Sequence, residues 1–427
     1  NAEIGWKSMI YLTATGRNDW DSRLAFSDYK SFFYPSIGLS AILTSMFNAP
    51  DWLTYLKVRG SYTEVGNSYG RFMTTVTYPY DEQTQSWTST SSYPNTKLKP
   101  ERTKSWEVGL DARILNDISL NLTYYRSNTY NQTFYADLSL SSGYSNIPIQ
   151  SGNIMNEGLE MSLGYNKQWK DFSFNTNYTL TWNKNRVKRL ADGVYNYATG
   201  QPIQMPELSP LTYGHTDARL ILRVGGSMGD VYGQRLLKRD LNGYILNEEG
   251  VGLAMENKET YLGSILPKMN MGWSLGFGYK GVNLGMTFTG RFGGIVISET
   301  QSVLDAAGVS KVSADVRDAG GVQINQSKVS AQTYYQTIQG TAAYYTYSAT
   351  NVRLGELSLS YTLPKKWFDN KVGMTVGLVG KNLWMIYCKA PFDPELTTSA
   401  ASNFYQGFDA YMLPSTRNFG FNVKFQF

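Results

Sequence analysis

Large apolar residues alternate with small or polar residues along many short stretches of this 427-residue chain. The last stretch is the clearest case, with an apolar residue at every second position: Phe419, Phe421, Val423, Phe425 and Phe427. A period of two predicts a β-strand with one apolar face and one wet face. An edge strand of a soluble β-sandwich can have this pattern. So can a strand of an outer-membrane β-barrel, where lipid covers the apolar face.

The same alternation recurs along the chain, and it predicts about 12 strands. The clearest hairpin joins 106–114 to 118–124 through Asn116 and Asp117, and its phase places Leu110 toward lipid and Asp111 toward the lumen. A further strand pair within 186–266, near 218–224, would raise the number to about 14. The expected strands lie at about 5–16, 33–46, 55–62, 106–114, 118–124, 159–165, 172–182, 273–279, 282–288, 357–363, 372–378 and 418–427.

Short turns and long polar connections follow one another in strict alternation. The long ones lie at about 67–100, 186–266, 293–349 and 385–415. Bacterial barrels have short periplasmic turns and long outward loops, whereas a sandwich does not sort its connections by length. No apolar strand face carries a charge, and a lipid-facing Lys or Arg would cost about 2–4 kcal/mol at mid-membrane. We therefore predict an all-β fold, an antiparallel transmembrane β-barrel whose long loops face outward.

The composition excludes several classes of function but does not identify one. Charged residues are only 17% of the chain, and 32 Tyr and 10 Trp suit a membrane–water interface. The net charge of +5 is mild and scattered, so no nucleic-acid partner is expected. Cys388 and His215 are the only residues of their types, and His215 reads as a surface or loop residue. Without a carboxylate pair, nucleophile or metal cluster, we expect no enzyme activity, no metal and no cofactor.

Paired tyrosines in the loop at 293–349 are the weak candidates for ligand binding. Their rings could stack on sugars or pack against peptides, and they could equally stiffen the loop. These residues are Tyr334, Tyr335, Tyr344, Tyr345 and Tyr347.

Several stretches resemble the SusC-like (RagA-like) family of TonB-dependent outer-membrane transporters. They are YLTATGRNDW at 11–20, LKVRGSY at 56–62, LKPERTKSWEVGLD at 98–111, NIMNEGLE at 153–160, GELSLSYTLP at 355–364 and GKNLW at 380–384. The resemblance implies a 22-stranded barrel in the outer membrane of a Gram-negative bacterium, filled by an N-terminal plug and capped by a SusD-like surface lipoprotein. It implies import of oligosaccharides or peptides driven by the TonB complex. It also implies that Phe427 and Phe425 belong to a signal for barrel assembly.

No stretch of residues 1–427 resembles the family's plug, TonB box or signal peptide. We therefore expect residues 1–427 to form the C-terminal portion of the barrel, with the plug and the N-terminal strands absent from this chain. The strands at 5–16 and 418–427 would then both be edges that need partners. Two rival functions stay open, a passive outer-membrane porin and a soluble all-β glycan-binding protein.

Overall fold

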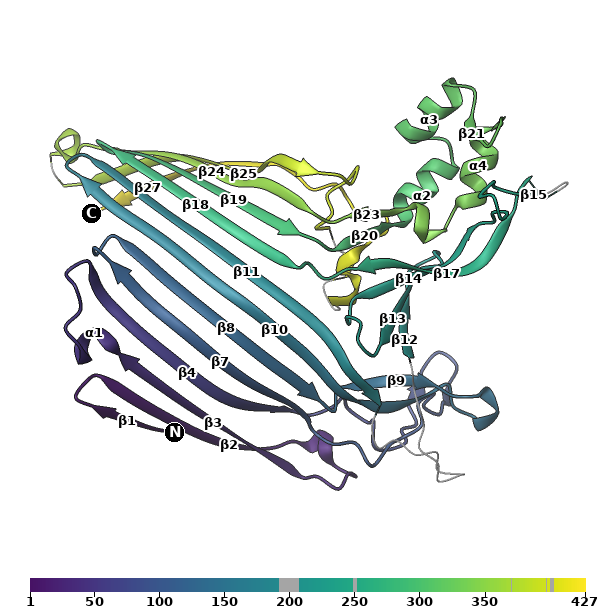
Figure 1. Ribbon diagram of the computed structural model, residues 1–427, viewed down its shortest axis with the longest axis horizontal. Helices are drawn as coiled ribbons and strands as arrows, with labels where there is room; N and C mark the ends of the chain where they lie inside the picture. The colour runs from purple at the N-terminus through teal and green to yellow at the C-terminus, as the bar shows by residue number, and fades with distance from the viewer. Residues whose placement is uncertain (192–206, 249–251, 370, 397, 400–402) are drawn as a thin grey trace. The chain divides into compact units, whose positions relative to one another are not determined.

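The computed structural model describes residues 1–191, 207–248, 252–369, 371–396, 398–399 and 403–427. The chain forms two compact units, one of Asn1–Pro210 with Leu222–Met228 and the other of Leu211–Ile221 with Gly229–Phe427. Each unit is built on an antiparallel sheet whose strands follow chain order (Figure 1).

The sheet of the first unit runs in the order β1-β2-β3-β4-β7-β8-β10-β11. Its strands are β1 (Ala2–Trp6), β2 (Ile10–Trp20), β3 (Ser31–Ile42), β4 (Leu53–Asn67), β7 (Glu101–Ile114), β8 (Ile118–Tyr130), β10 (Asn146–Trp169) and β11 (Phe172–Ala191). The connections carry η1 (Ser22–Leu24), α1 (Leu43–Met46), β5 (Tyr80–Asp81), β6 (Ser86–Trp87), β9 (Thr133–Asp137) and η2 (Leu140–Ser142).

The sheet of the second unit runs in the order β18-β19-β24-β25-β27. Its strands are β18 (Met269–Tyr279), β19 (Val282–Phe292), β24 (Asn351–Leu363), β25 (Gly373–Cys388) and β27 (Asn418–Gln426). Between β19 and β24 lie β20 (Ile295–Ser298), α2 (Glu299–Ala306), α3 (Lys311–Asp318), β21 (Val322–Ile324), β22 (Ser327–Val329), α4 (Ala331–Ile338), η3 (Ala342–Tyr344) and β23 (Thr346–Ser348).

The remaining elements are small. They are β12 (Glu207–Thr212), β13 (Arg219–Arg223), β14 (Asp230–Leu237), β15 (Asn247–Glu248), β16 (Gly252–Leu253), β17 (Met255–Ser264), η4 (Lys365–Phe368), η5 (Asn403–Gly407) and β26 (Phe408–Asp409). Among the residues that the structure describes, no helix is both long and apolar enough to cross a membrane.

The strands confirm the all-β expectation, with three corrections. The stretch 5–16 is not one strand but parts of the hairpin β1–β2, in which Trp6 pairs with Ile10. Lys7 and Ser8 make this turn with φ of 49° and 55°, and neither is a residue type that predicts a left-handed conformation. The pair expected near 218–224 exists as β13 and β14, but it belongs to a separate small sheet. The loop expected at 293–349 contains three helices instead of irregular chain.

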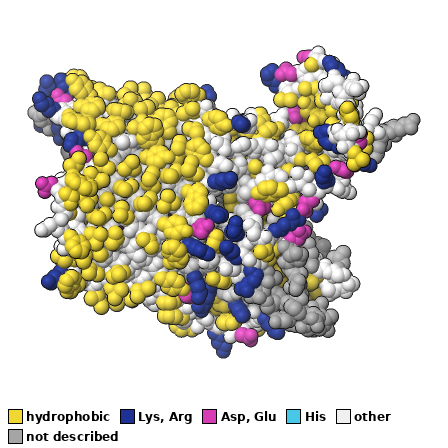
Figure 2. All heavy atoms as spheres, viewed as in Figure 1, with side chains coloured by type: hydrophobic (Ala, Val, Ile, Leu, Met, Phe, Trp, Pro, Cys, Tyr) yellow, Lys and Arg dark blue, Asp and Glu magenta, His cyan; other side chains and the backbone are white. Residues whose placement is uncertain are grey.

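Each sheet has one face on which large apolar side chains are exposed. In the first unit, Ile37, Leu39 and Val108 are each at least half exposed at every-second positions of β3 and β7. In the second, Phe419, Phe421 and Phe425 are exposed along β27. In Figure 2, hydrophobic side chains gather over the strands, with many Lys and Arg side chains beyond the apolar band. An exposed apolar surface of this extent needs a nonaqueous environment or a partner to cover it.

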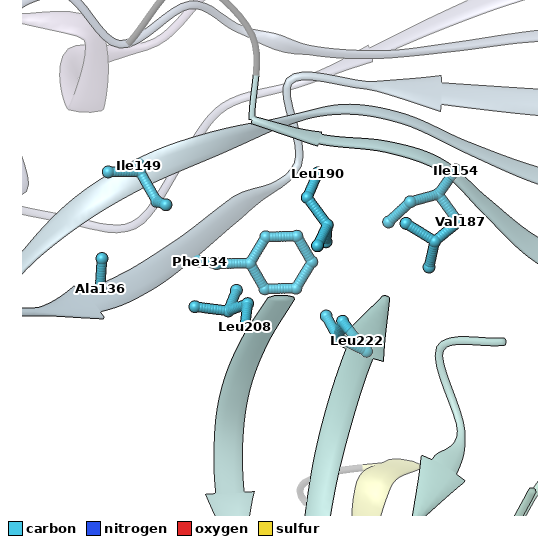
Figure 3. Packing of buried hydrophobic residues seen from close by; sticks show 8 residues of the cluster. All are labelled: Phe134, Ala136, Ile149, Ile154, Val187, Leu190, Leu208 and Leu222. Atoms are coloured by element: carbon cyan, nitrogen blue, oxygen red, sulfur yellow. The ribbon is translucent and has the colours of Figure 1, made fainter. Parts of the chain in front are cut away.

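The hairpin of β10 and β11 is longer than a membrane crossing requires. β10 has 24 residues and β11 has 20, whereas a tilted transmembrane strand needs about 9–11. A buried cluster covers the ends of these strands away from their tight turn (Figure 3). It consists of Phe134, Ala136, Ile149, Ile154, Val187, Leu190, Leu208 and Leu222. The long-loop end of the first unit is therefore a folded region with its own core.

Candidate functional site

A charged network lies on the polar face of β4 and β7 in the first unit. Arg59 of β4 is directly opposite Gly109 of β7, so its side chain lies between Glu107 and Asp111. Its Nη1 is 3.9 Å from Glu107 Oε2, and its Nε is 3.8 Å from Asp111 Oδ2. Its Nη2 donates a hydrogen bond of 2.6 Å to Thr123 Oγ1 on β8. One cation thus joins three strands on the face opposite the exposed apolar residues.

Gly109 makes this arrangement possible. A Cβ at this position would lie 2.7 Å from Arg59 Nε, a distance that real side chains essentially never show. The glycine therefore leaves the space that the guanidinium occupies. The ion pairs are partly exposed, and such pairs add little stability, about 0–1 kcal/mol. The network therefore adds little to the stability of the sheet, and its main effect is to fix hydrogen-bond donors and acceptors on the polar face.

Further polar contacts continue across β8, β10 and β11. Tyr125 Oη donates to Asn183 Oδ1 at 3.0 Å, and Ser162 Oγ donates to Asn177 Oδ1 at 3.0 Å. On the other side of the network, a groove of about 150 Å³ is lined in part by Tyr11, Lys57 and Arg59. The polar face therefore offers hydroxyl, amide and charged groups in succession, which suits a solute rich in hydrogen-bonding groups.

The sequence analysis missed this network. The alternation identified the polar face, but it could not show that Arg59 and Asp111 meet, because their pairing depends on the register of β4 and β7. The signal that could have found them is a basic residue in one strand and, in the strand expected beside it, two acidic residues four positions apart with a glycine midway between them.

The five candidate tyrosines pack in and around a hydrophobic core of the second unit. Tyr335 and Tyr345 are buried in a cluster with Leu237, Ile324 and Ile338, and the other three pack against that cluster. Tyr344 Oη accepts a hydrogen bond of 3.1 Å from the Leu237 amide, and the rings of Tyr334 and Tyr335 meet edge to face at 5.2 Å. Burial raises the pKa of Tyr347 to about 12. Ligand contact by the five tyrosines stays a prediction, and burial leaves Tyr335 and Tyr345 little surface for it.

The C-terminal aromatic residues lie on the apolar face of an edge strand. Phe425 of β27 pairs with Met374 of β25, and Phe427 directly follows the strand and is almost fully exposed. Their exposure makes them accessible to lipid or to another protein. Their role as an assembly signal stays a prediction.

A buried ionic cluster at one end of β24 was also missed by the sequence analysis. Arg353 Nε and Nη2 donate to Asn351 Oδ1 at 3.2 Å and 3.1 Å, and Asn351 Nδ2 donates to Glu395 Oε1 at 3.0 Å. Asp393 completes the cluster by accepting hydrogen bonds from Arg353. Burial alone would raise the pKa of Asp393, but the hydrogen bonds from Arg353 and from the Glu395 amide hold that pKa below its ordinary value. The cluster fastens the segment 389–396 to the second sheet.

The two-faced sheets are those of an outer-membrane β-barrel receptor. The family model described as "TonB dependent receptor-like, beta-barrel" matches residues 1–383, so the chain belongs to this family. The sequence resemblance to TonB-dependent transporters is thereby confirmed at the level of the family, whose barrels lie in the outer membrane.

Curated relatives carry the same family name. TonB-dependent receptor P3 of Formosa agariphila is 25% identical over 459 residues, which cover 98% of this chain and 44% of that protein. TonB-dependent receptor SusC of Bacteroides thetaiotaomicron is 27% identical over 154 residues, which cover 35% of this chain and 14% of that protein. The chain thus spans a little under half of the curated relatives that it matches along its full length.

Solved structures show the same fold. The RagAB peptide importer in its closed-closed state has a TM-score of 0.73 at 19% identity, covering 99% of this chain and 46% of the matched chain. The open-open state of the same importer has a TM-score of 0.72 at 21% identity, covering 99% of this chain and 45% of the matched chain.

Proposed function

We propose that this protein takes part in TonB-dependent import of oligosaccharides or peptides across the outer membrane. The observation that carries the proposal is the division of the strands into an exposed apolar face and an opposite face that holds the Arg59 network. Lipid would cover the first face, and the second would line the path of a hydrophilic solute. Membership of the TonB-dependent receptor family supports active import over passive diffusion.

The proposal includes further strands and a plug that complete the barrel. Among the described residues, β1 pairs only with β2, and β27 pairs only with β25. An unpaired strand edge is not tolerated in lipid, because its backbone N–H and C=O groups would have no partners. We infer that residues 1–427 form the C-terminal portion of a barrel of about 22 strands with a plugged lumen. The remaining strands and the plug, with its contact to the TonB complex, would come from a longer precursor or from another chain.

The proposed partner on the outer surface is a SusD-like lipoprotein. The loop after β4 carries exposed aromatic side chains such as Tyr78 and Trp87, and the folded region between β19 and β24 carries exposed polar and aliphatic side chains, so both could receive such a lid. Protease added to intact cells should cut within the long connections only after the lipoprotein is removed. Cleavage confined to the short turns near Asn116 or Gly281 would show that the proposed orientation is inverted.

Uptake by whole cells tests the proposed function. Cells that express the protein should accumulate labelled oligosaccharides or short peptides, and the solute should be recovered chemically unchanged. Deletion of TonB should abolish accumulation, while the amount of assembled barrel stays the same. Accumulation that persists without TonB, together with steady ion conductance by the purified protein, would establish a passive porin instead.

A further inference from the structure

A polar pocket of about 400 Å³ lies within the second unit. Its size falls within the range of about 300–1,000 Å³ that is usual for small-molecule sites. The residues that the argument uses are His215, Arg235, Glu299, Gln336, Gln339 and Tyr411. Val303 is the only aliphatic side chain among the described residues that line it. These residues are almost 200 positions apart at the extremes, so only the fold brings them together.

Glu299 at the start of α2 is a buried carboxylate with spare hydrogen-bonding capacity. It is 4% exposed, and it accepts one hydrogen bond from the His215 amide and one from Tyr411 Oη, each of 3.3 Å. Both are longer than usual, and among the described residues no basic side chain pairs with Glu299. A carboxylate has about four acceptor positions, so Glu299 can accept further hydrogen bonds.

Gly214 lets the backbone of its turn lie directly against this carboxylate. Its φ is +51°, and a Cβ at this position would lie 2.0 Å from Glu299 Oε2. No side chain fits there, so the turn that carries His215 presents only its backbone to Glu299.

Arg235 of β14 supplies the opposite charge. The nearest acid is Asp217, whose Oδ2 is 3.8 Å from Arg235 Nε and accepts the amides of Gln234 and Arg235 at 3.0 Å and 2.7 Å. Its Oδ1 accepts the Ala342 amide at 2.6 Å. Backbone amides already donate hydrogen bonds to both carboxylate oxygens of Asp217. The Arg235 guanidinium therefore keeps N–H groups that can point to a ligand.

Tyr411 is held at the pocket in a strained backbone conformation. Its φ is +55°, which is unfavourable for a residue other than glycine and needs surrounding contacts to maintain it. Its amide donates to Thr300 Oγ1 at 2.7 Å, and its hydroxyl donates to Glu299. The side chain nevertheless remains exposed, so a ring is available at the pocket.

We propose that this pocket binds a neutral sugar unit of an oligosaccharide. The inference rests on the proposed function and narrows its substrate from oligosaccharide or peptide to oligosaccharide. A sugar hydroxyl can donate to Glu299 while a neighbouring hydroxyl accepts from Arg235, so both charges are satisfied by one uncharged ligand. Gln336 and Gln339 add donors and acceptors, and Tyr411 adds an aromatic surface for the ring. Val303 is the one aliphatic side chain among the described residues of the lining, which therefore gives little of the apolar contact that peptide side chains commonly make.

Binding by the full-length purified protein in detergent tests the proposal. The probes are an array of neutral oligosaccharides and a library of tripeptides. The variants are Glu299→Gln and Tyr411→Ala, and the control is Asp315→Asn, which removes an exposed carboxylate of α3 paired with Lys311. The protein should retain neutral oligosaccharides, and both pocket variants should weaken Kd at least about 10-fold, as expected for loss of a charge-assisted hydrogen bond or of ring contact. The control should bind like the unaltered protein, and all variants should show the same heat-modifiable barrel band.

Three outcomes would overturn the proposal. The array could retain no neutral oligosaccharide, the pocket variants could bind as tightly as the control, or tripeptides could bind in place of sugars and be lost in Glu299→Gln. An assay of uptake by cells distinguishes a failure of the pocket proposal from a failure of the proposed function. Pocket variants with unchanged sugar binding and unchanged TonB-dependent uptake reject the pocket alone. Uptake that continues without TonB rejects active import but leaves the binding result standing.

Discussion

Arg353 of β24 holds the carboxylate of Asp393 with two parallel hydrogen bonds. Nη1 donates to Oδ2 at 2.9 Å, and Nη2 donates to Oδ1 at 2.8 Å. Both side chains are about nine-tenths buried, so water screens this pair far less than the exposed pairs of the chain. The two residues are 40 positions apart, and their contact ties the segment 389–396 to the end of a strand.

Removal of one member of this pair should loosen the segment 389–396. Asp393→Ala leaves the Arg353 charge buried with only Asn351 and the more distant Glu395, so we expect a loss of about 3–5 kcal/mol in local stability. Hydrogen exchange of the amides at 389–396 measures this loss. The matched control is Glu356→Ala, which removes the exposed partner of Lys381 at 3.7 Å and should cost at most about 1 kcal/mol. Equal protection in the two variants would contradict the prediction.

The same contact should respond to acid in a defined direction. The pKa of Asp393 is lowered in the folded protein, so its ionised form contributes stability above the unfolded pKa of about 3.9. That contribution is lost only as the pH falls through the lower folded-state pKa. Exchange protection at 389–396 should therefore hold from neutral pH to about pH 4 and fall below it. Loss of protection already near neutral pH would show that another group controls the segment.

Substitutions on opposite faces of β7 should differ in their effect on assembly. Leu110 pairs with Val58 and Leu122 on the apolar face, whereas Asp111 lies beside Arg59 and Asn121 on the polar face. Leu110→Lys should cost about 2–4 kcal/mol at mid-membrane, and Asp111→Asn should be tolerated. The amount of heat-modifiable barrel in outer-membrane fractions reports the difference. Equal tolerance of both substitutions would argue against the assignment of the faces.

Deletion of Phe427 should lower the amount of assembled barrel. The residue ends the aromatic strand that resembles the assembly signal of the family, and it is exposed for contact. Quantitative blotting of outer-membrane fractions measures the effect. Trp87→Ala, an exposed aromatic substitution in the loop after β4, serves as the control. Normal levels of the deletion variant would leave Phe427 as a lipid-facing residue without a signal role.

Cross-linking can decide whether the two edge strands meet. Because β1 precedes β2 at the edge, the informative positions are Ile4 and Val423, in a Cys388→Ser background. If other strands complete the barrel, Ile4→Cys and Val423→Cys should not cross-link, since paired strands lie about 4.8 Å apart and these would not be paired. Efficient cross-linking between them would mean a complete small barrel and would favour the passive porin.

Alternation alone predicted most of the strands because each sheet has one apolar and one polar face. The hairpin at 106–124 was found correctly, since its cross-strand pairs, such as Leu110 with Leu122, repeat every second residue. The stretch 5–16 was wrong because Trp6 and Ile10 keep the hydrophobic rhythm through a turn made by Lys7 and Ser8. The alternation of apolar and polar residues has the same phase on both sides of that turn, so no pattern in the sequence marks it.

The candidate sites were harder to predict than the strands. Ser298, Ser310 and Ser330 each accept a hydrogen bond from an amide three residues later. Serine is common at helix N-caps, so the sequence contains signals for helix starts in the loop at 293–349 that the sequence analysis did not use. The pocket at Glu299 could not be predicted from the sequence. His215, Arg235 and Tyr411 reach it from segments far apart in sequence, and their proximity depends on packing that no local pattern records.

The helical region between β19 and β24 has a consequence for how such proteins diversify. β19 and β24 pair directly, with Arg291 opposite Asn351, although residues 292–350 separate them. The inserted helices pack on a tyrosine-rich core that also includes Leu237 of β14 and Leu253 of β16, and they do not interrupt this pairing. An insertion of this kind can lengthen, shrink or exchange its surface residues while the strands beneath keep the same partners. Substitutions at the pocket residues of this insertion, such as Glu299, Gln336 and Gln339, can therefore alter substrate preference without any change to the pairing of β19 and β24.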